Sequence, residues 1–258
     1  MITGAYQFAV TGSIAENMLH IEEAVRQAAA AKVQLLVFPE CSLTGYPPHD
    51  FPASSDVDFA EVDRSLTRLQ NLSALHGIHI IIGAVTVSNE KYFNSAVHLS
   101  PDKEPEHYRK RALWGWDRKN FSEGTDDGIF EICGVRIGVR ICYEVRFPEY
   151  FRELYADRTD LNIILFYDIA KTENSERYRL ISAHIMTRAV ENVCRTLSVN
   201  TCAEHQTAPT ALFDGSGHQL AALPPEREGL LVYKLLPKEN DFGEQGRAEI
   251  SDRLLGLD

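Results

Sequence analysis

Two hydrophobic periodicities run along this chain, and each predicts a different kind of element. A continuous apolar run at 33–38 (VQLLVF) predicts a strand buried on both faces, and 78–87 and 161–167 also predict strands. Met18, Ile21 and Val25 recur at helical spacing behind a capping box at 13–16 (SIAE), which predicts an amphipathic helix to about residue 31. The same spacing predicts helices over 58–77, 147–158 and 177–193, and further strands are predicted at 5–10, 93–100, 134–144, 195–200, 210–214 and 230–235.

The order of these elements mixes strand–helix–strand crossovers with hairpins. Such a mixture predicts an α/β protein in which helices cover the outer faces of two sheets. No repeat or long polar linker divides the 258 residues, so we expect one domain over 1–258. Residues 236–258 have weak patterning and are expected to form a surface tail or an arm that reaches a partner subunit.

Composition narrows the class of partner. The net charge of −11, with scattered basic residues, argues against a nucleic-acid backbone. No apolar run is long enough for a membrane span, and the N-terminus does not resemble a signal peptide. The five cysteines are irregularly spaced, which favours free thiols and a cytoplasmic location. Neither HExxH nor Cys-x-x-Cys occurs, so no metal site is predicted.

Three reactive side chains stand at the ends of predicted strands. Glu40 follows the buried strand 33–38, Lys110 follows the 78–100 hairpin, and Cys142 lies near the end of the strand 134–144. A thiol is only slightly ionised at neutral pH and needs a base beside it, a role that a carboxylate can fill. A lysine can neutralise the charge on a carbonyl oxygen as the nucleophile adds.

Each of these residues also has a plain structural explanation. A cysteine at a strand end is usually a small buried hydrophobe, and a lysine in a charged run such as YRKR is usually solvated. Glu40 could cap a helix or pair with an arginine, although an unpaired buried acid is costly.

Taken together, the segments around these residues resemble the nitrilase superfamily of carbon–nitrogen hydrolases. LLVFPECSLTGYPP is similar to its glutamate motif, YRKRALW to its lysine motif, and GVRIGVRICYEVRFPEYFREL to its cysteine motif. HIMTRAVENVCRTLSVN and ALFDGSGHQLA are similar to later segments of that family, so the likeness covers roughly residues 5–235 in order.

The resemblance implies a fold and a catalytic set. The fold is a four-layer αββα sandwich of two mixed β-sheets with helices on the outer faces, commonly paired into homodimers or larger homo-oligomers. The catalytic residues are Glu40 as base and Cys142 as nucleophile. Lys110 and the backbone N–H of Tyr143 stabilise the oxyanion. No metal or organic cofactor is implied.

Other pocket residues are carried over less directly. The family often has a second active-site glutamate after the lysine, and the nearest match here is Asp117, which could equally be a loop acid. Glu144 and Arg146 could line the pocket, or Arg146 could pair with an acid nearby. After the strand 161–167 the chain departs from the family pattern, so that Tyr167 is expected to form a different pocket wall.

The expected function is therefore hydrolysis of the C–N bond of a small carboxamide through a cysteine thioester, with release of ammonia. Two alternatives stay open, a nitrile or N-carbamoyl hydrolase of the same fold and a non-catalytic interaction scaffold. The sequence does not identify the substrate, the pathway or the size of the oligomer.

Overall fold

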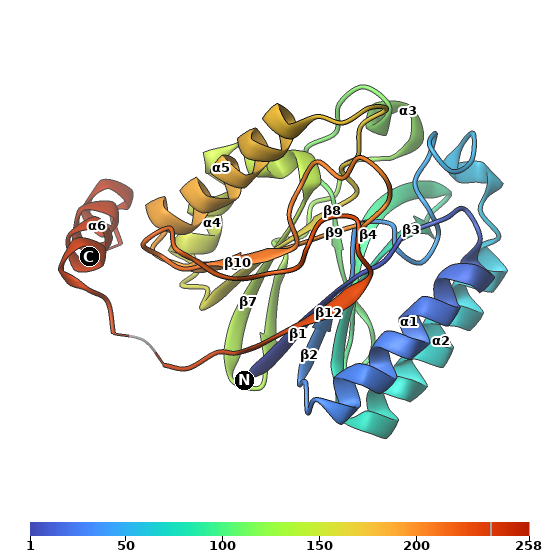
Figure 1. Ribbon diagram of the computed structural model, residues 1–258, viewed down its shortest axis with the longest axis horizontal. Coiled ribbons are helices and arrows are strands. Elements are labelled where there is room, and N and C mark those ends of the chain that lie inside the picture. Colours follow the sequence, from blue (N-terminus) through green and yellow to red (C-terminus); the bar gives the residue numbers. More distant parts are fainter. Residues whose placement is uncertain (238, 258) are drawn as a thin grey trace.

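Two six-stranded β-sheets, stacked face to face, form the centre of the computed structural model (Figure 1). The structure describes residues 1–237 and 239–257. The strand order is β12-β1-β2-β3-β4-β5 in the first sheet and β11-β10-β9-β8-β7-β6 in the second. The strands are β1 (Ile2–Gln7), β2 (Leu35–Val37), β3 (His79–Ser88), β4 (Lys91–Leu99), β5 (Glu106–Arg109), β6 (Ile129–Ile132), β7 (Val135–Ile141), β8 (Leu161–Phe166), β9 (Arg195–Asn200), β10 (Ala211–Phe213), β11 (Gln219–Ala222) and β12 (Gly229–Lys234).

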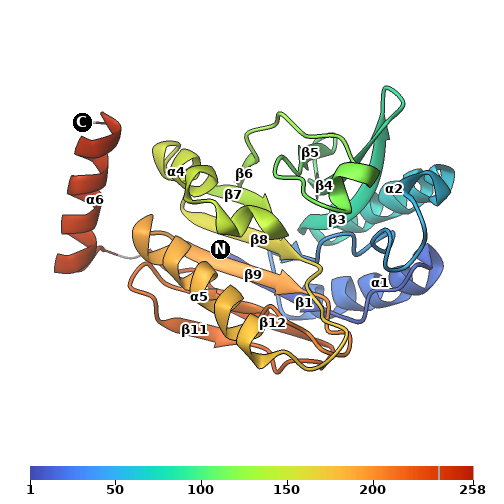
Figure 2. The same cartoon turned by 90° about the horizontal axis from the view of Figure 1, so that it is seen from above.

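Helices cover the outer face of each sheet. The helices are α1 (Ile14–Ala30), α2 (Phe59–His76), α3 (Asp117–Asn120), α4 (Pro148–Ala156), α5 (Ser175–Glu191) and α6 (Phe242–Leu255). Figures 1 and 2 show α1 and α2 on the outer side of the first sheet and α4 and α5 on that of the second. The prediction of a four-layer αββα sandwich of two mixed sheets is confirmed.

Each sheet combines parallel and antiparallel pairs, as the mixture of crossovers and hairpins predicted. In the first sheet β1, β2 and β3 are parallel, and β3 pairs with β4 through the expected hairpin around Asn89. In the second sheet β7, β8 and β9 are parallel, which sets Ile141, Leu165 and Val199 side by side. These three side chains are buried between the two sheets, because parallel strands in such a sandwich have two covered faces.

The position of Glu40 depends on a glycine in the neighbouring strand. Gly83 of β3 lies against the backbone that carries Glu40, and a Cβ atom there would stand 2.2 Å from the oxygen of Pro39 and 2.4 Å from the nitrogen of Cys41. The same backbone hydrogen-bonds to the second sheet, from the N–H of Glu40 to the oxygen of Phe166 at 3.2 Å. Gly83 therefore sets how deeply Glu40 enters the space between the sheets.

We expect Gly83→Ala to lower the free energy of unfolding by about 1–3 kcal/mol, because the added methyl group must push backbone rather than a flexible side chain. Urea unfolding checks this. Gly246→Ala is the matched control, since nothing lies within 4 Å of the added methyl group on α6. An unchanged unfolding midpoint for Gly83→Ala would contradict the close approach.

A histidine pair links β3 to β4 at the other end of the first sheet. Nδ1 of His79 and Nε2 of His98 are 3.1 Å apart, so one nitrogen donates and the other accepts. Nδ1 of His98 also lies 3.1 Å from Oε2 of Glu106, and its ring packs 5.0 Å from that of Phe130 in the second sheet. Burial lowers the pKa of His98 to about 4, against the opposing effect of its hydrogen bond to Glu106.

A folded-state pKa below the ordinary histidine value of ~6.5 means that the unfolded chain binds the extra proton first. The free energy of unfolding is therefore highest above pH ~6.5. It falls as the pH drops towards 4, by up to on the order of 3 kcal/mol. Urea unfolding at pH 7.5 and at pH 5 measures this change. Between the two pH values, the free energy of unfolding should fall less for His98→Gln than for the parent. The exposed His76→Gln variant should lose as much unfolding free energy as the parent. An identical loss in the parent, His98→Gln and His76→Gln would show that His98 is not its cause.

The C-terminal segment was expected to be a weakly patterned tail, and it contains helix α6. Its capping box was present in the sequence: the side chain of Asp241 accepts from the N–H of Glu244, whose side chain reaches back to Asp241. Gly256 ends the helix at φ +66°. Figure 1 shows α6 outside the layers, beyond α4 and α5, and the hydroxyl of Tyr155 on α4 donates to Asp252 at 2.7 Å.

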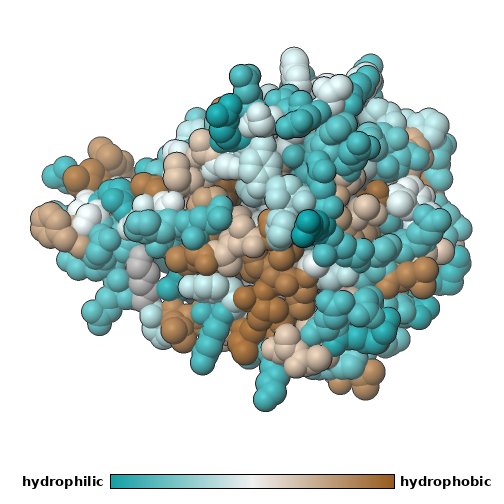
Figure 3. Space-filling view, in the orientation of Figure 1, coloured by the Kyte–Doolittle hydropathy of each residue, from teal (hydrophilic) through white to brown (hydrophobic). Residues whose placement is uncertain are grey.

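Short edge elements were also absent from the sequence prediction, namely β5, β6, β11 and α3. Figure 3 shows apolar surface in the region of β1 and β12. Met1, Tyr233 and Leu235 are partly buried there against the core between the sheets. Among the described residues, no helix has the length and apolar character needed to cross a membrane.

Candidate active site

Glu40 stands just beyond the end of β2, where the two sheets meet, and only 1% of the residue is exposed. Its Oε1 accepts from Nζ of Lys110 at 2.9 Å and from Nδ2 of Asn94 at 2.7 Å. Its Oε2 accepts from the backbone N–H of Tyr167 at 2.9 Å. Three donors from three different segments therefore hold this buried carboxylate in one orientation.

Lys110 follows β5 and is buried between two acids. Besides its bond to Glu40, its Nζ lies 2.8 Å from Oδ2 of Asp117, the first residue of α3. Oδ1 of Asp117 in turn accepts from the hydroxyl of Tyr46 at 2.5 Å. The loop acid singled out in the sequence thus lies beside Lys110, although the shorter side chain made that placement uncertain from the sequence.

Cys142 is the first residue of a short 3-10 turn (Cys142–Arg146) that follows β7. Its φ of +46° is in the left-handed region, which L residues seldom occupy outside constrained sites. Burial raises the pKa of its thiol, the nearby Glu40 carboxylate raises it further, and the Lys110 ammonium opposes both. The three predicted residues are therefore close enough to interact electrostatically, which the spacing of 70 residues between Glu40 and Lys110 does not reveal.

Each charge in this cluster stabilises the charged form of its neighbour of opposite sign. Burial raises the pKa of the Glu40 carboxyl, and the attraction of Lys110 opposes that rise. Burial alone would lower the pKa of Lys110, but the Glu40 and Asp117 carboxylates outweigh it and keep the pKa above its usual value. The site thus holds an ammonium that its two acids keep charged and a carboxyl that is more basic than a solvent-exposed one.

Two residues of this site were not anticipated. Asn94 is a buried polar residue on β4, and its Oδ1 lies 3.7 Å from Sγ of Cys41. Tyr46 lies in the loop after Glu40 and holds Asp117. A buried asparagine requires partners for its amide, and this requirement was the available sequence signal for Asn94.

Glu144 was expected to line the pocket, but its carboxylate is fully buried and turned into the protein. Its Oε2 accepts from the N–H of Ile141 at 2.6 Å, and its Oε1 accepts from the N–H of Arg111 at 2.7 Å, from that of Ala112 at 3.3 Å and from the hydroxyl of Tyr108 at 2.8 Å. Glu144 therefore ties the turn that carries Cys142 to the segment that carries Lys110. We interpret it as a positioning residue.

Three other expected pocket residues have distinct surroundings. The ring of Tyr143, which follows the cysteine, packs edge-on against Phe147 at 5.3 Å. The guanidinium of Arg146 lies 6.0 Å from the Tyr143 ring, and within the described residues it forms no ion pair with Glu144 or Glu149. The hydroxyl of Tyr167 donates to Asp50 at 3.0 Å, so its side chain braces the loop after Glu40.

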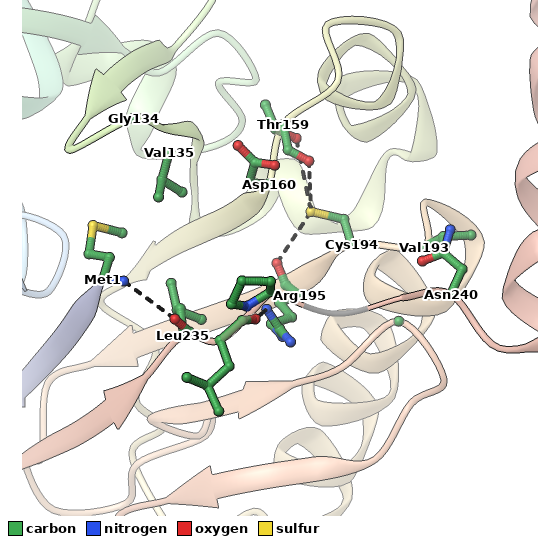
Figure 4. A pocket seen from close by; sticks show the side chains of 13 residues that line it. Met1, Gly134, Val135, Thr159, Asp160, Val193, Cys194, Arg195, Leu235 and Asn240 are labelled. Atoms are coloured by element: carbon green, nitrogen blue, oxygen red, sulfur yellow. Dashed lines mark hydrogen bonds between the residues drawn. The ribbon is translucent and has the colours of Figure 1, made fainter.

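A cavity of about 520 Å³ lies at the other end of the second sheet (Figure 4). Val135, Asp160 and Arg195, at or next to the starts of β7, β8 and β9, line it. Its cysteine, Cys194, donates to the oxygen of Thr159 at 3.3 Å, and burial raises the pKa of that thiol to about 12. None of Glu40, Lys110 and Cys142 lines this cavity, and Cys142 follows the opposite end of β7, so the cavity is separate from the catalytic cluster.

The sequence model of the carbon–nitrogen hydrolase family matches residues 2–239. The chain belongs to this family. The resemblance inferred from the glutamate, lysine and cysteine motifs is thereby confirmed, and Glu40, Lys110 and Cys142 all lie within the matched part of this carbon–nitrogen hydrolase.

Relatives of this carbon–nitrogen hydrolase include two proteins named as amidases. An (R)-stereoselective amidase of Pseudomonas sp. is 29% identical over 73% of this chain and 66% of its own length. The 2-oxoglutaramate amidase of Bacillus subtilis is 26% identical over 73% of this chain and 71% of its own length. The chain thus aligns with about two thirds of the length of these relatives.

Solved structures share the fold of this carbon–nitrogen hydrolase. An amidase from Nesterenkonia sp. superposes with a TM-score of 0.79 at 24% identity, over 98% of this chain and 96% of that one. In a mutant of the Nesterenkonia amidase, with a TM-score of 0.82 and 22% identity over 100% of this chain and 96% of its own, the acetamide moiety of fluoroacetamide is attached to the active-site cysteine.

Proposed function

We propose that this carbon–nitrogen hydrolase cleaves the C–N bond of small carboxamides through a thioester on Cys142. The observation that supports this most directly is the buried Glu40–Lys110–Asp117 cluster, which lies within electrostatic reach of the Cys142 thiol. The amidase activity of the Pseudomonas and Bacillus relatives is consistent with it.

The first step is attack by sulfur on the amide carbon. Oε1 of Glu40 already accepts two hydrogen bonds and Oε2 accepts one, so Oε2 has a lone pair left for the proton of Cys142. As that proton moves to Oε2, the S–C bond forms and the carbonyl electrons move to oxygen. The base and the nucleophile thus exchange one proton without a histidine.

The oxyanion formed in this step needs donors that are already in position. The ammonium of Lys110 has three N–H groups, of which two are directed to Glu40 and Asp117. The third is left for the oxyanion, together with the backbone N–H of Tyr143. Because Asp117 and Glu40 fix the ammonium, little reorganisation is required when the charge develops.

The remaining steps use Glu40 twice more. Protonated Glu40 gives its proton to the amide nitrogen, the C–N bond breaks and ammonia leaves, with the acyl group on sulfur. Glu40 then takes a proton from water, the resulting hydroxide adds to the thioester, and the C–S bond breaks. The carboxylic acid leaves, and the proton on Glu40 passes to the sulfur of Cys142, which restores both residues.

Ammonia release over a panel of amides, nitriles and N-carbamoyl compounds tests this function. We expect release from carboxamides, an acyl adduct on Cys142 in intact-mass spectra, and no carbon dioxide. Ammonia together with carbon dioxide would point to an N-carbamoyl hydrolase, and turnover of nitriles alone to a nitrilase. The absence of turnover and adduct across the whole panel would favour a scaffold.

We further propose that the chain forms a homodimer or a larger homo-oligomer, with residues 236–258 as the contact arm. Phe242 and Leu254 on α6 are 93% and 76% exposed, and Leu180 on α5 is 48% exposed. Large apolar side chains exposed on α6 and α5 favour association. The cytoplasmic location stays a prediction from the cysteine content.

Light scattering coupled to gel filtration should give a mass of at least twice 29.0 kDa. Combined Phe242→Ser and Leu254→Ser substitutions should lower it towards one chain. Leu75→Ser is the matched control, since Leu75 is 74% exposed on α2, on the far side of the sandwich. A parent protein that elutes as a monomer would contradict the proposed oligomer and the role of residues 236–258 in it.

A further inference from the structure

A second buried carboxylate lies next to the proposed active site and holds an arginine. Asp168 follows Tyr167 beyond β8 and is 5% exposed. Its Oδ1 accepts from Nε of Arg177 and its Oδ2 from Nη2 of Arg177, both at 2.8 Å, and the hydroxyl of Thr207 also donates to Oδ1. The amide of Asn200 bonds to the backbone of Asp168 on both sides, so the carboxylate has little freedom to move.

This pair stands beside the nucleophile. The N–H of Tyr167, one residue before Asp168, donates to Glu40, which places Asp168 close to the catalytic cluster. The Asp168 carboxylate is also one of the charges that raise the pKa of Cys142, and Cys142 contributes to the raised pKa of Arg177. The arginine is thus within reach of a short substrate bound at Cys142.

The guanidinium of Arg177 has an edge that the protein does not use. It carries five N–H groups, and Asp168 takes the edge formed by Nε and Nη2. The edge formed by Nη1 and Nη2 has no acceptor among the residues that the structure describes. The Arg177 side chain is 41% exposed in the first turn of α5, so this edge is accessible to a ligand.

We propose that Arg177 binds a carboxylate on the substrate, so that the preferred substrates are monoamides of short dicarboxylic acids. This inference rests on the proposed amide hydrolysis. A planar edge with two parallel N–H groups matches a carboxylate, and Asp168 holds it ready. The acids Glu40, Asp117 and Asp50 oppose an anionic substrate, but Glu40 and Asp117 share the Lys110 ammonium and Asp50 is bonded to Tyr167, whereas the arginine contact is direct.

A matched pair of substrates separates the carboxylate from the rest of the molecule. Succinamate and butyramide have the same four-carbon chain and amide, and succinamate carries a carboxylate in place of the terminal methyl group. We expect kcat/KM to be about 10- to 100-fold higher for succinamate, as for one charge-assisted contact. Equal values in the parent would overturn the inference and leave amide hydrolysis intact. No ammonia from either amide would count against the proposed function itself.

Three variants locate the effect. Arg177→Gln should reduce the succinamate-to-butyramide ratio about tenfold or more, and Arg177→Lys should reduce it less, because the charge remains but the fork is lost. The exposed Arg179→Gln variant should keep the parental ratio. If Arg177→Gln lowers kcat/KM equally for both substrates and also lowers the Tm, the ion pair only stabilises the packing of α5 against the segment after β8. The inference is then wrong. If Arg146→Gln removes the preference instead, the carboxylate is bound there and Arg177 is not its partner.

Discussion

Cys142→Ser is expected to lower kcat for carboxamides by on the order of 10⁴-fold or more while the fold is retained. The hydroxyl of serine is a far weaker acid than a thiol, and Glu40 is not a strong enough base to ionise it. The substitution changes one atom in a half-buried residue, so the packing around the turn should survive. Steady-state ammonia release and the circular dichroism spectrum measure the two effects.

The exposed Cys133→Ser variant is the matched control, because it removes a thiol at the turn between β6 and β7. It should keep the parental kcat. An acyl adduct should be seen by mass spectrometry in the parent and in Cys133→Ser, and it should be absent from Cys142→Ser. A comparable kcat in Cys142→Ser and the parent would remove this thiol from the mechanism.

Glu40→Gln is expected to have the second large effect, a fall in kcat of about 10²–10⁴-fold. Glutamine cannot take the thiol proton. It also disturbs the resting site, because an amide presents one oxygen and one NH₂ group to three donors that now converge on Glu40. At least one donor loses its acceptor, so the free energy of unfolding should fall by about 1–3 kcal/mol.

The pH dependence separates loss of the base from simple damage. In the parent, kcat/KM should fall on the acidic side as Glu40 takes a proton, at a pH above the usual carboxyl range because burial raises its pKa. That acidic limb should be missing from Glu40→Gln. The exposed Glu104→Gln variant should reproduce the parental profile, and an acidic limb that persists in Glu40→Gln would assign it to another group.

Asp117 illustrates a departure from the family pattern that the structure accommodates. The shorter acid reaches Lys110 at 2.8 Å because α3 starts at Asp117 itself and Tyr46 holds its other oxygen. The sequence contained both residues, 71 positions apart, without any signal that joined them. Their contact depends on two loops that meet only when the first sheet has formed.

The sequence by itself determined the long elements and the reactive residues. Hydrophobic periodicity located β3, β8, α1 and α5 to within a few residues, because each long element buries one or two faces and must repeat its apolar positions accordingly. The three motifs identified Glu40, Lys110 and Cys142, because the family pattern extends over the residues around each of them.

Only the tertiary structure decided how these residues meet and what holds them. Strands of four residues such as β5 and β6 are too short for a periodic signal, and they form because a neighbouring strand offers hydrogen bonds. The roles of Asn94 and Glu144 in the site also depend on tertiary structure. A buried polar group must find partners, and the partners come from segments that lie close together only after the two sheets have stacked.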